Sequence, residues 1–205
     1  MIKLEKEYNE KYSSIPTDFD ERMQYLLEKT KLTLDTEKVS KVINEIKNIK
    51  WNKIEYTIYL LPKATPRPRS GKNGVFYVKG AKDNKKFFKK FIEDKNMNNI
   101  PIITTPTKFY CDSYFPIPNS MNNVEKICAE LGIIRPTSKP DWDNVAKAYC
   151  DMIQGILIYD DSLIVEGNSR KFYSLKPRIE IKIEYMEDYD SKFNKRKIKN
   201  KEGGN

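Results

Sequence analysis

The segment KPDWDN contains two aspartates separated by a single residue, and a lysine follows shortly after it. Asp141 and Asp143 flank Trp142. In an extended segment both aspartates project from the same face with their Cα atoms about 7 Å apart, so one cation can bridge them. Lys147 follows Asp143 by four residues, which on the first turn of a helix places its ammonium on the side of Asp143. Two acids beside a lysine suit phosphoryl transfer, with a metal held by carboxylates and developing negative charge met by the lysine.

A second acidic pair, Asp160 and Asp161, follows an apolar run, and Asp161 lies 18 residues after Asp143. A helix of about 12 residues and a return segment would bring this turn back beside the start of the helix. Each feature also has a purely structural interpretation. Aspartates before a helix act as caps, Asp-Asp-Ser is ordinary turn chemistry, and Lys147 can pair with Asp151 on the surface of the helix.

Histidine is absent from the chain, and this narrows the chemistry more than any percentage does. Its absence excludes Ser-His and Cys-His nucleophiles, histidine acid–base catalysis and imidazole metal sites. Carboxylate oxygens remain as metal ligands, and they favour hard cations such as Mg²⁺ or Mn²⁺. The three cysteines, Cys111, Cys128 and Cys150, fit neither a disulfide framework nor a CxxC pair, which indicates reduced structural thiols.

Positive charge is concentrated in residues 63–90, where ten basic residues stand against one acid. The net charge of this stretch, +9, equals that of the whole 205-residue chain. Such a run is usually a solvated face, but here it shares a domain with the acidic motifs and suits phosphate contacts. Phe76 and Tyr77 within it are candidates either for a wedge in DNA or for core packing. The expected DNA-binding residues are Lys63, Arg67, Arg69, Lys72, Lys79, Lys82, Lys86, Lys90 and Lys139.

Three parts follow from the patterning of the chain. Residues 1–50 show two amphipathic helices, one capped by Thr17 and Asp18 and the next by Asp35 and Thr36, which favour packing or dimerisation over direct contact with DNA. Residues 51–186 mix strand and helix patterns and predict one α/β domain of the α+β type, a small mixed β-sheet with helices. Residues 187–205 form a basic tail that we expect to be disordered.

Within residues 51–186 the element order is readable from periodicity. Alternation from 53 to 60 predicts a strand, the Pro/Gly-rich residues 62–80 a long loop or hairpin arm, and 82–94 a helix with Phe87, Phe88 and Phe91 inward. Asp143 is a good N-cap for a helix over 144–154. The remaining expected elements are a strand at 107–115, a helix at 121–131, and strands at 163–173 and 178–185 that close the domain as a hairpin.

Taken together, KPDWDNVAKAYCDMIQGILIYDDSLIVE resembles the signature of the RusA family of Holliday junction resolvases. The shared features are KPDxDN, a lysine four residues after the second aspartate, a Gly-containing helix end and a DDS turn entering a strand. The resemblance extends more loosely over 54–185, including the PRPR loop, and does not cover the N-terminal 50 residues or the tail. It implies a RusA-like fold in which Asp141, Asp143 and Asp161 are the catalytic acids and metal ligands and Lys147 is the catalytic lysine.

The function implied by this resemblance is a structure-selective endodeoxyribonuclease that nicks two strands of a four-way junction as a homodimer. Mg²⁺ is the expected cofactor, with Mn²⁺ as a substitute, and phage and prophage genomes are the expected source. Two alternatives stay open: a nuclease acting mainly on forks and flaps, and a non-catalytic architectural protein that binds junctions. Substitution of single aspartates discriminates the last from an enzyme.

The chain has no stretch approaching the roughly 18 uncharged apolar residues of a membrane span. Its first ten residues carry acidic side chains and no apolar core of the kind that signal peptides have. We therefore expect a protein of the bacterial host cytoplasm that has no membrane partner.

Overall fold

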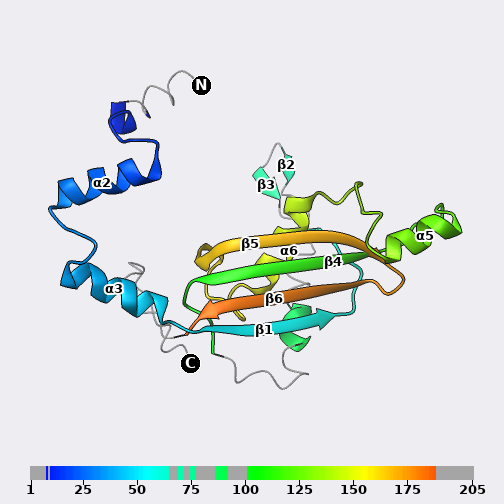
Figure 1. Cartoon of the computed structure of the whole chain (residues 1–205). Coiled ribbons are helices and arrows are strands. Elements are labelled where there is room, and N and C mark those ends of the chain that lie inside the picture. The colour runs from blue at the N-terminus through cyan, green and yellow to red at the C-terminus, as the bar shows by residue number, and fades with distance from the viewer. Residues whose placement is uncertain are drawn as a thin grey trace. The chain divides into compact units, whose positions relative to one another are not determined.

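The structure is a computed structural model that describes residues 8, 10–64, 69–71, 74–76, 86–91 and 101–187, with the backbone alone described for 69–71 and 74–76. The chain divides into two compact units, Met1–Ile49 and Lys50–Asn205 (Figure 1). Apart from Glu187, the expected basic tail lies outside the described residues. Within the described part of the chain, no helix has the length and apolar character needed to cross a bilayer.

In the first unit, α2 (Phe19–Thr30) and α3 (Glu37–Lys47) lie at the positions that the apolar spacing predicts. Asp18 caps α2 by accepting hydrogen bonds from the backbone N–H groups of Asp20 and Glu21, the usual role of an aspartate at this position. Neither helix contains a fully buried residue. Several residues of the two apolar stripes are half-buried.

Four strands form one mixed sheet in the second unit, in the order β1, β6, β4, β5 (Figure 1). Strand β6 runs antiparallel to both of its neighbours, whereas β4 and β5 are parallel. The bounds are Trp51–Ile58 for β1, Thr107–Pro116 for β4, Ile164–Ser174 for β5 and Arg178–Met186 for β6. This small mixed sheet with its helices confirms the predicted α+β fold class.

The order of the last two strands corrects the expected hairpin. Although β5 and β6 are consecutive in the chain, β4 lies between them, and residues 175–177 pass over the end of β4. Burial explains the arrangement. Strand β6 places Ile179, Ile181 and Ile183 in the core, while β5 is mostly exposed or half-buried. The apolar strand therefore takes an inner position and the polar strand an edge, where charged side chains protect unpaired backbone groups.

Helix α6 (Trp142–Ile153) lies behind the sheet in the view of Figure 1 and packs on its apolar face. Strand alternation turns Phe109 and Cys111 of β4 toward this helix, beside the three isoleucines of β6. The helix residues buried here are Val145, Ala148, Tyr149, Met152 and Ile153. Because this packing leaves the helix start at the rim of the core, the residues just before and after Trp142 stay exposed.

The second helix of this face is described over residues 86–91. Phe88 is fully buried and Phe91 packs against the core, as the sequence predicts. Their rings lie 6.1 and 6.3 Å from the ring of Tyr56 on β1. Phe87 is 41% exposed, so its predicted inward position is wrong: in a helix, adjacent residues diverge by about 100°, and the inward face already holds Phe88 and Phe91.

The Pro/Gly-rich loop contains a short antiparallel pair, β2 (Arg69–Gly71) and β3 (Gly74–Phe76). This pair agrees with the expected hairpin arm. Tyr77 and the side chain of Phe76, the candidates for a wedge in DNA, lie outside the described residues.

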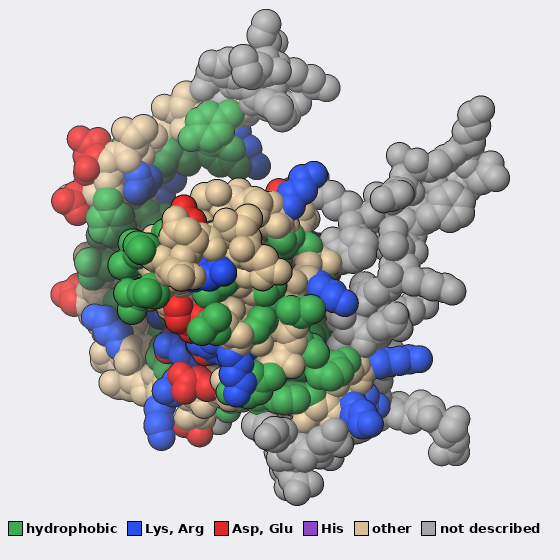
Figure 2. All heavy atoms as spheres, turned by 90° about the vertical axis from the view of Figure 1, so that its right-hand side faces the viewer, with side chains coloured by type: hydrophobic (Ala, Val, Ile, Leu, Met, Phe, Trp, Pro, Cys, Tyr) green, Lys and Arg blue, Asp and Glu red, His purple; other side chains and the backbone are tan. Residues whose placement is uncertain are grey.

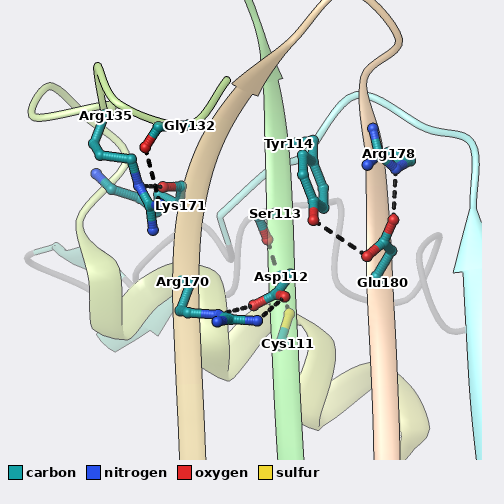
Figure 3. Close-up of polar contacts among 10 residues, drawn as sticks. All are labelled: Cys111, Asp112, Ser113, Tyr114, Gly132, Arg135, Arg170, Lys171, Arg178 and Glu180. Atoms are coloured by element: carbon teal, nitrogen blue, oxygen red, sulfur yellow. Dashed lines mark hydrogen bonds and ion pairs between the residues drawn. The ribbon is translucent and has the colours of Figure 1, made fainter. Parts of the chain in front are cut away.

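The other face of the sheet carries charged and aromatic side chains in pairs (Figure 3). Arg170 on β5 donates from Nε to Asp112 on β4 at 2.8 Å. Arg178 donates to Glu180, which also accepts a hydrogen bond from the hydroxyl of Tyr114. A hollow of about 470 Å³ lies on this face. Asp112 and Glu180 are thus each engaged by an arginine in a charge-assisted pair.

Burial of thiol and phenol groups, which ionise at alkaline pH, makes the stability of the fold sensitive to alkali. Burial raises the pKa of Cys111 to about 12, of Cys150 to about 11 and of Tyr56 to about 12. Unfolded, these groups lose their protons at lower pH, so the native state binds more protons and the free energy of unfolding falls as pH rises. We expect a stable Tm up to about pH 9 and a steady fall between about pH 9 and 12.

Circular dichroism melts from pH 7 to 11 measure this dependence. Cys111→Ala should melt at a lower temperature at pH 7 but show a shallower alkaline slope, because one of the buried protons is gone. An unchanged Tm up to pH 11 in the parent protein would contradict the raised pKa values of these buried groups.

Candidate active site

Helix α6 begins at Trp142, two residues earlier than the sequence predicts. Asp141 has the extended conformation of an N-cap, and Asp143 is in the first helical turn. The prediction that Asp143 is the N-cap is therefore wrong, and the two aspartates do not share one extended segment. Asn144 donates a hydrogen bond to Asp141 at 3.4 Å. Both carboxylates are exposed, at the positive end of the helix dipole, which favours negative charge.

Lys147 lies one turn further along α6, four residues after Asp143. Its ammonium is 3.2 Å from Asp151, an i, i+4 ion pair. The hydrogen bond to Asp151, with smaller contributions from the charges of Asp151 and Asp161, raises the pKa of Lys147. Lys147 thus carries its positive charge throughout the neutral range, and the pairing with Asp151 that the sequence allowed is present.

The chain reverses direction after α6 and returns along it. Gly155 adopts φ of 72°, a conformation that glycine accepts without strain, and its backbone N–H donates to Ile158 at 2.6 Å. Gln154 then contacts Asp160 at 3.4 Å. Asp161 follows as the first residue of a short 3₁₀ turn, and its charge influences both Lys147 and the thiol of Cys150. This turn therefore brings Asp161 into electrostatic range of Lys147.

The predicted carboxylates differ in how closely they are gathered. Asp141 and Asp143 share the start of α6, whereas Asp161 reaches the helix from the returning turn, near Lys147. Among the described residues, no group of three or more acidic, Cys or His side chains is close enough to form a ready metal site. The donor chemistry nevertheless fits a hard divalent cation, because all three side chains are exposed carboxylates.

A clamp that sequence reasoning missed fixes the loop before α6. The ammonium of Lys171 on β5 donates to the carbonyl oxygens of Ser138 and Pro140, each at 3.0 Å. The indole N–H of Trp142 donates to the carbonyl of Ser169 on the same strand at 2.6 Å. Asp141 therefore lies between two anchors on β5. In the sequence, Lys171 is a lysine in an expected strand and Trp142 is a tryptophan between two aspartates. Neither pattern indicates which residues they contact.

Arg135 joins the same loop to β5 from further back (Figure 3). It donates from Nε to the carbonyl of Lys171 at 2.9 Å and reaches the carbonyl of Gly132 at 3.3 Å. Its guanidinium lies 3.6 Å from the ring centroid of Phe172. The preceding helix α5 (Asn123–Glu130) is anchored too, because Glu130 accepts hydrogen bonds from Ser174 and Leu175. The whole connection from β4 to α6 is thus held by β5.

Replacing Lys171 tests whether this clamp matters for chemistry. For the nuclease activity that the RusA resemblance implies, we expect Lys171→Met to lower the rate by about 10- to 100-fold, because a catalytic group displaced by about 1 Å costs on this order. The Tm should fall only modestly, since two hydrogen bonds contribute about 1 kcal/mol each. Lys171→Arg should recover part of the rate, and Lys176→Met, at an exposed lysine nearby, should leave it unchanged. Single-turnover nicking rates and thermal melts of the variants test this prediction. It would be contradicted if Lys171→Met nicked DNA at the rate of the parent protein.

The expected DNA-binding residues are only partly described. Lys63, Lys86, Lys90 and Lys139 are exposed. The backbone N–H of Lys63 donates to the hydroxyl of Tyr149 on α6 at 2.9 Å, which ties the start of the basic loop to the helix of the candidate site. Arg69 lies in β2 without a described side chain. Arg67, Lys72, Lys79 and Lys82 lie outside the described residues.

Two comparisons with known proteins match this chain. The chain is 36% identical over 135 residues to the uncharacterized protein YqaN of Bacillus subtilis (strain 168), a match that covers 63% of this chain and 94% of that protein. The family model described as endodeoxyribonuclease RusA matches residues 60–184. The matched segment contains Asp141, Asp143, Lys147 and Asp161, together with the strands that anchor them. The chain therefore belongs to the RusA family of endodeoxyribonucleases, enzymes that hydrolyse phosphodiester bonds of DNA.

Proposed function

We propose that this protein is a Mg²⁺-dependent endonuclease that resolves four-way DNA junctions as a homodimer, by paired symmetric nicks. The observation that carries the proposal is the family match across one constellation: two aspartates at the start of α6, Lys147 one turn later, and Asp161 on the returning turn. Because this member of a DNA nuclease family has no histidine, carboxylates and a lysine remain for the chemistry.

In this proposal Asp141, Asp143 and Asp161 would hold the divalent cation. When bound, Mg²⁺ supplies an activated water and stabilises negative charge on the phosphate. Lys147 keeps its proton because Asp151 raises its pKa, so its ammonium can stabilise the scissile phosphate or the departing oxygen. The anchors from β5 hold Asp141 in position before the substrate arrives.

Basic residues of the same unit are proposed to bind the DNA backbone. Lys139 is exposed and precedes Asp141 by two residues. Lys63 is also exposed, and its backbone is tied to Tyr149 of the same helix α6. Their charge offsets the negative potential that three aspartates present to a polyanion. Binding should weaken with salt, with a slope of about −0.9 per neutralised phosphate on duplex arms.

A homodimer follows from the substrate. A four-way junction has two-fold symmetry, and an isologous dimer presents two equal sites to two strands of the same polarity. One protomer alone has one such constellation and would produce single nicks.

Cleavage of an end-labelled immobile four-way junction tests the proposal, against duplex and fork controls, with and without Mg²⁺. Gel shifts of the same DNAs in chelator measure binding separately. We expect paired symmetric nicks on the junction when Mg²⁺ is present and no nicks when it is left out. Cleavage mainly of forks would instead establish a fork nuclease, and tight junction binding without cleavage in Mg²⁺ or Mn²⁺ would leave an architectural role.

A further inference from the structure

A small pocket opens beside the loop that carries Asp141, on the helix-covered side of the sheet. Its volume is about 180 Å³, and its lining residues are Phe115, Tyr173, four prolines, Ser138, Lys139 and Lys171. Pro140, one of the prolines, directly precedes Asp141. Figure 2 looks at the end of the sheet where β4 finishes, and shows hydrophobic side chains there with Lys and Arg side chains around them.

The lining indicates the chemistry of the occupant. Aromatic and proline residues offer apolar surface, and Lys139 adds an exposed positive charge, while no acidic residue lines the pocket among those that the structure describes. The volume is below the roughly 300–1,000 Å³ of sites for drug-sized ligands, which suits a single planar ring system. A nucleobase fits these requirements, because aromatic side chains stack on the face of any base and cations contact its phosphate.

The position of the pocket relates it to the reaction. Lys171 donates to the carbonyls of Ser138 and Pro140, so the same loop forms the pocket wall and presents Asp141. Lys139 is exposed at this wall, where it can meet a phosphate. A base held here would therefore lie against the loop that presents Asp141.

We propose that this pocket binds a nucleobase unstacked from the DNA next to the scissile phosphate, with Tyr173 as its stacking platform. The inference deepens the proposed nuclease function and rests on it for the position of the cleaved bond. It predicts that the nuclease prefers certain bases at one position beside the nick, because a pocket of fixed size distinguishes purines from pyrimidines.

Fluorescence of 2-aminopurine in a short single-stranded oligonucleotide tests the pocket without cleavage. In chelator, the parent protein should quench the base on binding. Tyr173→Leu should weaken binding by about 5- to 150-fold, the equivalent of one stacked base, and lose the quenching. Tyr173→Phe should retain both. Tyr110→Leu, which removes a ring from the open face of the same sheet, is the matched control and should behave as the parent.

The inference is overturned if the parent shows no quenching, if Tyr173→Leu binds and quenches as the parent does, or if both leucine variants lose affinity equally. Melts of each variant show that it is folded. A second arm maps nicks on junctions that differ in the base beside the cleavage site, where Tyr173→Leu should flatten the parental preference. Failure of the parent to nick any junction would count against the proposed function alone, because the oligonucleotide arm requires no cleavage.

Discussion

Asp143→Asn is expected to lower the rate of junction nicking by about 10³-fold or more, while junction binding stays the same or becomes tighter. Asp143 is exposed in the first turn of α6, so the substitution removes no buried contact of the core. Asparagine keeps the shape but loses the charge that a hard cation requires of its ligand. The loss of one negative charge near the DNA reduces repulsion of the phosphates, which is why binding does not suffer.

Single-turnover nicking in Mg²⁺ and gel shifts in chelator measure the two effects separately. Glu187→Gln, which neutralises an exposed acid just after β6, is the matched control and should nick as the parent does. If Asp143→Asn loses binding and folding together with activity, the aspartate has a structural role, and the architectural alternative gains support.

Lys147→Met should reduce nicking by about 10²- to 10³-fold, the magnitude typical of removing one group that stabilises charge in a transition state. The side chain is exposed and held by its ion pair with Asp151 at 3.2 Å, so the fold should lose little stability, since exposed pairs contribute about 0–1 kcal/mol. Junction affinity should fall only slightly, because one cation among many is removed.

Asp151→Asn distinguishes this role from that of a surface ion pair. If Lys147 served only to pair with Asp151, both variants would behave alike. In our proposal Asp151→Asn stays active near neutral pH. It removes the main cause that raises the pKa of Lys147, so the alkaline fall of the rate should begin at lower pH than in the parent. A pH profile of single-turnover nicking shows the shift; identical rates in the two variants would contradict a catalytic lysine.

Local sequence patterns predicted most elements of the domain and much of the candidate site. Two-residue alternation in β1 and β6 identified strands with one buried face, and the capping aspartates located α2 and α6 within a residue or two. These signals are local, because side-chain direction and capping depend on neighbours within a turn or a strand pair. The segment that contains Asp141, Asp143, Lys147 and Asp161 resembles the RusA signature, and the family match confirms that resemblance.

Choices between equivalent local solutions required the folded structure. Two aspartates one residue apart are both good N-caps, and Asp141 takes this position while Trp142 is tied to Ser169 on a distant strand. Alternation tells which face of a strand is buried but not which strand lies beside it. For this reason the placement of β6 between β1 and β4 was not readable from a sequence in which β5 precedes it by three residues.

The sequence by itself determined the chemistry available to this protein: carboxylates and a lysine on one helix and its returning turn, no histidine, and a basic stretch in the same domain. Tertiary structure alone decided how that chemistry is held, through the contacts of Lys171 with the loop before α6 and the pocket beside it. The physical reason is separation along the chain. Lys171 lies 31 and 33 residues from its carbonyl partners, so only the folded chain brings them within hydrogen-bonding distance.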